Sequence, residues 1–141
     1  MLYSRLHTRH ARVVLILLTF IACALGGVCR YLGTLMIARF LGEGFPWGTL
    51  FVNAVGSFLL GLFLGSGFVA KELWLSSNGA YAFAALSFCG GLTTFSTFSL
   101  QTFSLISEQA WGKALANTLG SVLLCVFCVL SGYAMGEGLT Q

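Results

Sequence analysis

The sequence Gly90-Gly91-Leu92-Thr93-Thr94-Phe95-Ser96-Thr97-Phe98-Ser99 interrupts a segment that is otherwise apolar enough to cross a membrane. Glycine and the β-branched threonine are poor helix formers, and a helix end leaves backbone carbonyls and amides without partners. In lipid, such groups are tolerated only where they are buried in protein or line a cavity. The stretch therefore predicts a break in a transmembrane helix that holds something small.

Composition places the chain among integral membrane proteins. Of its 141 residues, 57% are hydrophobic and 8% are charged, whereas soluble domains carry roughly 25% charged residues. A span needs about 20 residues, so the length allows four spans without a soluble domain. We therefore expect an all-α membrane protein with a single domain over residues 1–141. Its basic N-terminal residues directly precede an apolar segment, which favours a membrane-flanking role over nucleic-acid binding.

Four apolar segments alternate with loops of polar and turn residues. We predict spans at approximately 13–38, 47–70, 80–106 and 113–135, preceded by a basic tail over 1–12. The third span contains the break. The second and fourth spans carry GxxxG pairs and the span ends carry tryptophans, which favours close helix packing and interfacial anchoring; these residues are Gly61, Gly65, Gly132, Gly136, Trp47, Trp74 and Trp111.

The first span begins like a secretory signal peptide, with Ala22-Cys23-Ala24 as a possible cleavage region. Because apolar sequence continues to Phe40, we interpret the segment as a span instead. The five cysteines all lie in apolar segments; Cys125 and Cys128 stand three apart on one helical face, but their apolar surroundings are those of no redox or zinc motif. We expect them to be free thiols.

An even number of spans puts both termini on the same side of the membrane. Four basic residues near the spans lie on that side and two on the other; the four are Arg5, Arg9, Arg12 and Lys71, and the two are Arg39 and Lys113. This excess favours a cytoplasmic N-terminus. Without the tail, the loop charges are nearly balanced.

Ionisable groups are almost absent from the predicted spans. Arg30 is the one charged residue in the interior of these spans, since Lys113 only begins the fourth, and the spans contain no carboxylate. Proton-coupled carriers use intramembrane titratable side chains, and acid–base catalysis needs a positioned pair. We therefore expect neither a proton-driven pump nor an enzyme. Arg30 either meets water or an anion, or it snorkels to the lipid headgroups.

Several polar and aromatic residues are candidates for an ion path. Asn53 is either a donor on that path or an interhelical hydrogen-bonding residue. Asn117, Ser121 and Cys125 recur every four residues, so they share a face that is either water-lined or a packing seam. Phe95 and Phe98 also share a face, and aromatic ring edges carry a partial positive charge that attracts small anions. Ordinary packing is the alternative for this pair.

Three segments carry the signatures of one known family of membrane proteins. Gly26-Gly27-Val28-Cys29-Arg30-Tyr31 is similar to the first-span signature of that family, and Gly48-Thr49-Leu50-Phe51-Val52-Asn53-Ala54-Val55-Gly56 to the second-span signature. Phe88-Cys89-Gly90-Gly91-Leu92-Thr93-Thr94-Phe95-Ser96-Thr97-Phe98-Ser99 matches the third-span signature almost letter for letter. Together these segments resemble the Fluc (CrcB) family of fluoride channels, and the resemblance covers nearly the whole chain in order.

The resemblance implies a role for each matching residue. Gly90 and Thr93 would offer backbone carbonyls to a structural Na⁺ at the two-fold axis of a dimer. Phe95 and Phe98 would coordinate fluoride. The remaining pore residues would be Asn53, Ser96, Thr97 and Ser121, with Arg30 near the aqueous vestibule.

The resemblance also implies an assembly and a location. Members of the family form antiparallel dimers with two pores, which agrees with the nearly balanced loop charges. The basic tail favours one orientation, which would require a homologous partner subunit in place of a second copy. The expected function is passive, fluoride-selective flow out of the cell through the plasma (inner) membrane of a bacterium, which lowers fluoride toxicity.

The chain departs from the family pattern at several positions. Ala22-Cys23-Ala24 replaces glycines that are frequent upstream in the first span, and Gln101 replaces a frequent glutamate. Asn117 stands where a tyrosine or another polar residue is common, and Cys125 where a serine can occur. Two rival functions make different demands: a four-helix multidrug transporter would need a mid-membrane glutamate, and a structural factor would conduct no ions.

Overall fold

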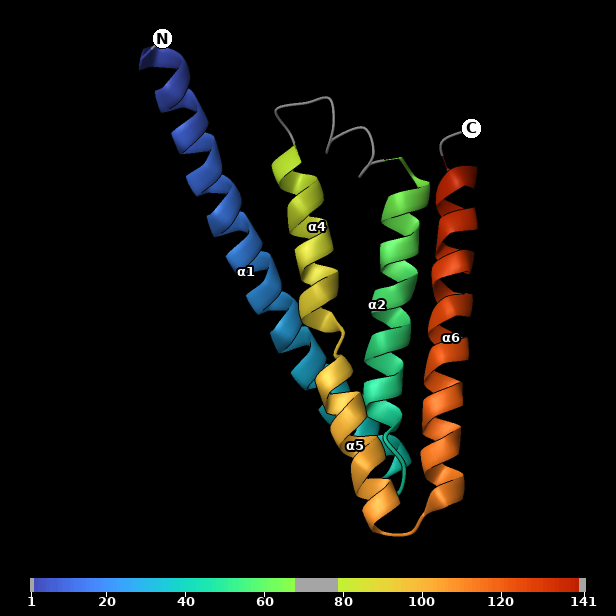
Figure 1. Cartoon of the computed structure of the whole chain (residues 1–141). Coiled ribbons are helices and arrows are strands. Elements are labelled where there is room, and N and C mark those ends of the chain that lie inside the picture. The colour runs from blue at the N-terminus through green and yellow to red at the C-terminus, as the bar shows by residue number, and fades with distance from the viewer. Residues whose placement is uncertain (1, 68–78, 140–141) are drawn as a thin grey trace.

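The computed structural model describes residues 2–67 and 79–139, and this part of the chain is entirely helical with connecting turns. The helices, in chain order, are α1 (Leu2–Leu41), α2 (Trp47–Gly65), α4 (Gly79–Leu92), α5 (Phe95–Ser107) and α6 (Trp111–Gly138) (Figure 1). The predicted loop that contains Lys71 and Trp74 lies outside the described residues.

Four segments are long and apolar enough to cross a membrane: Val13–Leu41, Trp47–Gly65, Ala82–Ser107 and Trp111–Gly138. The prediction of an all-α chain with four spans is confirmed. The third segment consists of α4 and α5 together. The N- and C-termini lie at the same end of the molecule (Figure 1).

Helix α1 continues through the basic tail, because it begins at Leu2 and runs for 40 residues. At 1.5 Å per residue it is about 60 Å long, roughly twice the thickness of the hydrocarbon core of a bilayer. Its span ends at Leu41, and Gly42 follows with φ = 79°, a left-handed conformation that stops the helix at low cost. The excess length of α1 is therefore all at its N-terminal end.

Helix α1 packs on α4 through glycines. A Cβ atom at Gly26 would collide with the carbonyl oxygen of Phe88, and one at Gly91 would collide with that of Cys23. The two backbones thus approach more closely than any other residue would allow. One glycine of the pair Gly90-Gly91 serves this contact, since Gly90 has open space at its Cβ position.

Helices α2 and α6 form a second glycine seam. The predicted GxxxG pairs face each other: Gly61 and Gly65 lie against the backbone at Val129 and Tyr133, while Gly132 lies against that at Phe58. Gly136 completes the seam beside Leu62 and Ser66. Close backbone approach maximises van der Waals contact where no hydrophobic force drives association in lipid.

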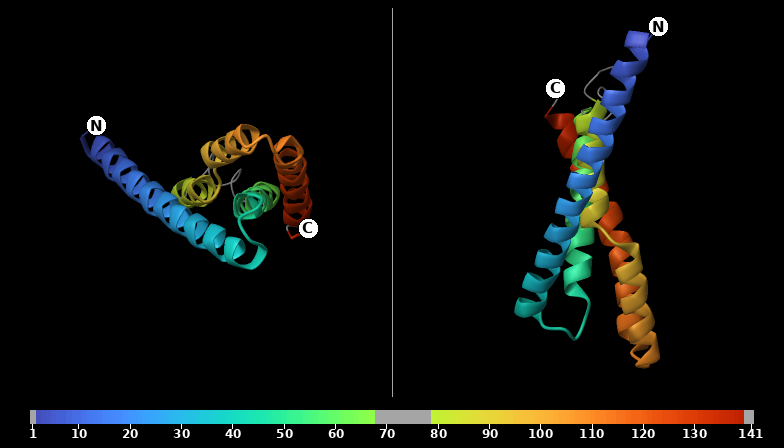
Figure 2. Two further views of the ribbon diagram at one scale, coloured as in Figure 1. Left: turned by 90° about the horizontal axis from the view of Figure 1, so that it is seen from below. Right: turned by 90° about the vertical axis from the view of Figure 1, so that its left-hand side faces the viewer.

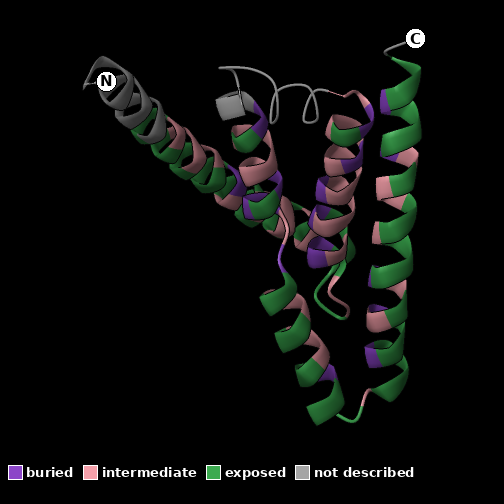
Figure 3. Ribbon diagram, turned by 45° about the horizontal axis from the view of Figure 1, so that its top comes forward, coloured by how far each residue is buried: buried purple, intermediate pink, exposed green. Residues whose placement is uncertain are grey.

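Helix α5 is held much less closely than the other helices. Its lower part and that of α6 diverge from the lower parts of α1 and α2 (Figure 2). Phe95, Leu100 and Phe103 are each more than half exposed on α5, and Leu105 is its buried residue (Figure 3). One large apolar face of α5 is therefore without a neighbour in the described part of the chain.

Candidate functional site

The third apolar segment changes helix at two threonines. Helix α4 ends at Leu92 and α5 begins at Phe95, with Thr94 as its N-cap in an extended conformation (φ −153°, ψ 122°). The amide and the hydroxyl of Thr93 both donate to the carbonyl of Cys89, at 3.0 Å each. The α4 helix is thus closed by Thr93, and the chain turns at Thr94.

Asn53 of α2 holds this turn by pairing with the backbone of Thr94. The Thr94 amide donates to Asn53 Oδ1 at 2.8 Å, and Asn53 Nδ2 donates to the Thr94 carbonyl at 3.2 Å. In an uninterrupted helix the Thr94 amide would donate to the Gly90 carbonyl. The side chain of Asn53 therefore replaces helical hydrogen bonds at the break and frees the carbonyl oxygen of Gly90.

Arg30 of α1 reaches the same turn from the other side. Its Nη1 donates to the carbonyl of Thr93 at 3.1 Å, and the side chain is half-buried. The Arg30 side chain is therefore directed to the break and does not snorkel to the headgroups. The guanidinium is a fixed positive charge directly beside the break.

The Thr94 hydroxyl caps α5 and gathers the neighbouring hydroxyls. It accepts a hydrogen bond from the Thr97 amide at 3.2 Å and donates to the Thr97 hydroxyl at 3.1 Å. The Ser96 hydroxyl lies 3.2 Å away. Threonine is a favoured N-cap because its oxygen satisfies an amide that the helix leaves free. The hydroxyl-rich sequence after the break is thus partly explained by capping.

A cavity of about 430 Å³ lies beside the break, between α2, α4, α5 and α6. We call it the central cavity. Its wall carries no charged side chain, and its polar groups are an amide, hydroxyls and thiols. Its lining residues include Asn53, Cys89, Gly90, Thr93, Phe95, Phe98, Ser121 and Cys125.

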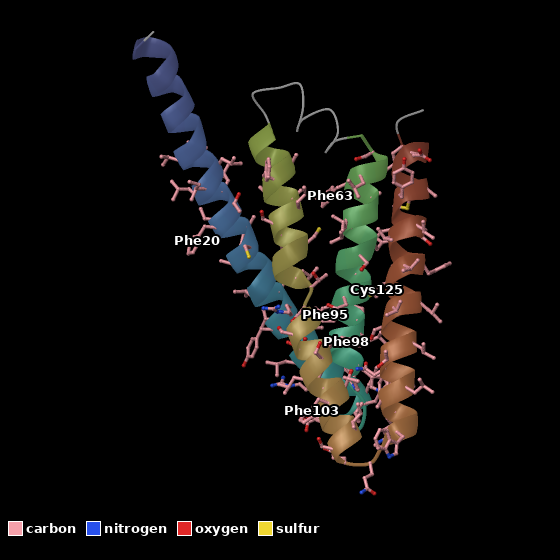
Figure 4. All side chains as sticks on the ribbon, viewed as in Figure 1. Phe20, Phe63, Phe95, Phe98, Phe103 and Cys125 are labelled. Carbon is pink, nitrogen blue, oxygen red and sulfur yellow. The ribbon has the colours of Figure 1, made fainter. Side chains whose placement is uncertain are left out.

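Phe95 and Phe98 lie in the first turn of α5, next to this cavity (Figure 4). Their ring centroids are 5.5 Å apart and the ring planes are inclined by 43°. Phe95 is 79% exposed, whereas Phe98 is half-buried. An aromatic ring this exposed is not explained by packing within one chain.

Behind the cavity wall, α5 and α6 are joined by polar side chains. Asn117, which is 2% exposed, donates from Nδ2 to the Thr102 hydroxyl at 2.8 Å. The Ser121 hydroxyl donates to Asn117 Oδ1 at 3.5 Å, the long end for a hydrogen bond. The predicted polar face of α6 is therefore a packing seam at Asn117 and lines the cavity at Ser121 and Cys125.

A second cavity, of about 480 Å³, lies where the α1–α2 and α5–α6 connections meet. It carries Glu43, Glu108 and Lys113, and the Lys113 ammonium donates to the Gly44 carbonyl at 2.8 Å. Gln101 also lines it, with a buried Oε1 that accepts no hydrogen bond from the described residues. We call it the loop-end cavity; it is the charged counterpart of the central one.

A family model described as "CrcB-like protein, Camphor Resistance (CrcB)" matches residues 17–133, which include every residue that lines the central cavity. The chain belongs to the CrcB family. The matched region contains the break, both phenylalanines, Arg30 and Asn53.

Curated relatives of this CrcB chain carry the name fluoride-specific ion channel FluC. That of Opitutus terrae is 40% identical over 118 residues, covering 84% of this chain and 89% of the relative. That of Thermus thermophilus is 43% identical over 123 residues, covering 87% and 95%. That of Gluconobacter oxydans is 40% identical over 126 residues, covering 86% and 84%. These relatives are ion channels and not enzymes.

The residues predicted for the CrcB site fall into two groups. Phe95, Phe98, Asn53 and Ser121 line the central cavity, together with Gly90 and Thr93. Arg30, Ser96 and Thr97 do not line it and instead lie around the break. The structure therefore brings together both the aromatic pair and its polar neighbours.

Two features of the site were missed by the sequence reasoning. The polar stripe predicts a packing seam as one of two alternatives for Asn117, but it does not indicate that this residue joins α5 to α6. For Asn53 the sequence predicts an interhelical hydrogen bond as one alternative, but not its pairing with the backbone of Thr94. A buried amide in a span signals a partner, but nothing in the spacing says which one.

Proposed function

We propose that this chain forms a passive, fluoride-selective channel in the plasma membrane of a bacterium and lets cytoplasmic fluoride leave the cell. The observation that carries the proposal is the central cavity, where Phe95 and Phe98 stand beside Asn53 and Ser121. The name of the relatives, fluoride-specific ion channel, supports the choice of ion. The domain is the single four-span unit 1–141.

The chemistry of this cavity suits a small anion that must be held weakly. Ring edges offer a weakly positive surface, and the amide and hydroxyl donors replace part of the water that the ion leaves behind. A lysine in the wall would bind an anion too tightly for rapid release. The absence of any carboxylate from the predicted spans favours passive flow over proton coupling.

Arg30 would serve the path electrostatically from behind the break. Its guanidinium holds the Thr93 carbonyl and places a positive charge near the cavity without lining it. Such a charge attracts an anion toward the break and leaves no deep binding site in its way. Ser96 and Thr97 remain predicted pore residues, with hydroxyls that cluster around Thr94.

A structural sodium ion is part of the proposal. The donor chemistry fits, because the Gly90 carbonyl is released by the Asn53–Thr94 pairing and Gly90 is exposed. The Thr93 carbonyl already accepts from Arg30 and has one lone pair left, so Gly90 is the stronger of the two proposed ligands. Bound Na⁺ would supply a charge that holds carbonyl oxygens of two breaks together.

The partner would be a second copy of the chain in antiparallel orientation. The exposed face of α5, with Phe95, Leu100 and Phe103, is the surface that supports this. A homologous subunit is the alternative partner, since the basic tail favours one orientation. An N-terminal tag probed from each side of the membrane decides: labelling from both sides supports the second copy. A single orientation with full activity for the chain alone contradicts both versions.

The test of the function is ion efflux from liposomes that contain only this protein. We expect fluoride to leave rapidly in the presence of a potassium ionophore, while chloride stays inside. Liposomes without protein and liposomes with Phe98→Ile give the background. Equal efflux of chloride, or no fluoride efflux above that background, would overturn the proposal.

A further inference from the structure

Asn117 is a fully buried amide that touches two helices at once. Its Nδ2 donates to Thr102 on α5, and its Oδ1 accepts from Ser121 on its own helix, α6. It does not line the central cavity. Each of its two hydrogen bonds nevertheless connects it to a residue that lines the cavity: the first, through Thr102, to Phe98, and the second to Ser121.

The first branch reaches the aromatic pair. The Thr102 hydroxyl, which accepts from Asn117, donates to the carbonyl of Phe98 at 2.8 Å. One hydroxyl therefore separates the amide from the backbone that carries the Phe98 ring. In the described part of the chain, the Asn117–Thr102 bond is the side-chain hydrogen bond that joins α5 to α6. Because α5 is otherwise held loosely, this bond sets its rotation beside the cavity.

The second branch reaches Ser121. A serine hydroxyl has one proton, so Ser121 can donate either to Asn117 Oδ1 or to an anion in the cavity, not to both. The bond to Asn117 is long, at 3.5 Å, and is correspondingly weak. An ion can accept this hydrogen bond in place of Asn117 Oδ1 and release it again at little cost, as a conducting site requires.

We propose that Asn117 is a positioning residue of the ion path: its amide orients Phe98 through Thr102 and holds the Ser121 hydroxyl until an ion accepts the hydrogen bond of that hydroxyl in its place. All donors then point the same way, from Ser121 through Asn117 and Thr102 to the Phe98 carbonyl. The amide suits this place because it donates at one end and accepts at the other. This inference rests on the proposed function.

The sharpest variant is Asn117→Asp, which keeps the shape and removes the amide donor. An ionised carboxylate only accepts, so Thr102 turns away from Phe98 and Ser121 is held too firmly. A protonated carboxyl donates to Thr102 and accepts from Ser121, which restores the chain. We expect fluoride efflux about tenfold below wild type at high pH, the effect of losing roughly one hydrogen bond. It should recover as the pH falls and the buried carboxyl takes up a proton.

The wild-type chain should lack this acid recovery. Helices α2 and α5 carry no charged residue, and those of α6 are Lys113 and Glu137, near its ends. The titratable side chains on the cavity wall are the thiols of Cys89 and Cys125. Liposomes without protein correct for the leak of hydrogen fluoride at each pH.

A negative charge near an anion path also lowers flux at high pH, so a second variant separates the two causes. Thr102→Val removes the hydroxyl without adding charge, and we expect it alone to lower efflux about tenfold. In the double variant Asn117→Asp/Thr102→Val the recovery of efflux at low pH should be largely lost, because the protonated carboxyl no longer has a Thr102 hydroxyl to which it can donate. A pure charge effect leaves the recovery intact in the double variant.

The matched control is Thr118→Val. Thr118 is next to Asn117 in the sequence, and its hydroxyl donates within α6 to the Ala114 carbonyl at 2.9 Å. The control variant should conduct like wild type, and Asn117→Asp/Thr118→Val should recover in acid. Normal efflux in Thr102→Val, or full acid recovery in its double variant, overturns the inference while wild-type selectivity stands. If the wild-type chain itself fails to conduct fluoride, it is the proposed function that has failed.

Discussion

Helix α6 meets its two neighbours in opposite ways. Against α2 it packs at Gly132 and Gly136, where no Cβ atom fits. Against α5 it makes a hydrogen bond between two side chains, Asn117 and Thr102. The glycine seam is rigid because it depends on backbone approach, whereas the polar contact can yield. The aromatic pair, Phe95 and Phe98, therefore lies on α5, the helix that is held most loosely. The closely packed scaffold, which is the glycine seam between α2 and α6, lies on the opposite side of α6.

The largest effect is expected where the seam is closed to a methyl group. Gly132→Ala puts a Cβ against the Phe58 carbonyl, and overpacking of this kind costs about 1–3 kcal/mol. We expect a lower melting temperature in detergent and loss of folded protein. Gly120→Ala on the same helix, where nothing lies within 4 Å, is the control. If Gly132→Ala and Gly120→Ala have the same melting temperature, the seam is not the rigid part of the molecule.

The next largest effect should fall on conduction and leave folding intact. Phe95→Ile and Phe98→Ile keep an apolar side chain but lose the ring edge, and each should lower fluoride efflux about tenfold or more, since ~1.4 kcal/mol at the barrier is tenfold in rate. Phe→Met at the same positions should lose less, because the thioether is polarisable.

Melting curves and size-exclusion profiles of the Ile variants should match wild type. Wild-type efflux in both would reduce the rings to packing. The loosely held helix α5 would then have no role in conduction that sets it apart from the α2–α6 seam.

Asn53→Ala tests a residue with two roles, since Asn53 lies on the closely packed helix α2 and also lines the central cavity. It leaves the amide and carbonyl of Thr94 without their partners, and a buried unpaired group costs about 1–3 kcal/mol. We expect lower stability together with a roughly tenfold loss of efflux. Deuterium exchange at the break should quicken as well. Unchanged exchange with reduced efflux would make Asn53 a pore donor alone.

The smallest effect is expected for Arg30→Gln. The amide of glutamine can still donate to the Thr93 carbonyl, so the break should stay closed, but the charge is lost. Efflux should fall a few-fold at low ionic strength and approach wild type in high salt, where charges are screened. An equal loss at all salt concentrations would point to a contact with the ion itself.

The scaffold could be read from the sequence far better than the site. The GxxxG pairs Gly61–Gly65 and Gly132–Gly136 predict close packing, and they pack against each other. The turn between α4 and α5 lies where Gly90-Gly91 and two threonines favour it. Helix-breaking and small-residue packing are local properties of the chain, so spacing reveals them.

The partners of polar side chains depend on helix rotation, which the sequence does not encode locally. The sequence predicts that Arg30 meets water or an anion or snorkels to the headgroups, and the partner that the structure gives it is the Thr93 carbonyl. Asn117 shares its face with Ser121, yet its amide donor goes to Thr102 on another helix. Such pairings follow from the tilt of α5 against α6, which is set only once all helices have packed.

The length of α1 has a consequence for how the chain enters the membrane. Its first turns extend beyond the span and carry Arg5, Arg9 and Arg12 in sequence. In the antiparallel arrangement proposed above, one copy must send this end outward against a membrane potential that is negative inside. That electrical work is about 2.3 kcal/mol per charge at 100 mV. The two orientations are therefore unequal during synthesis in an energised cell, and their ratio should follow the voltage present at insertion.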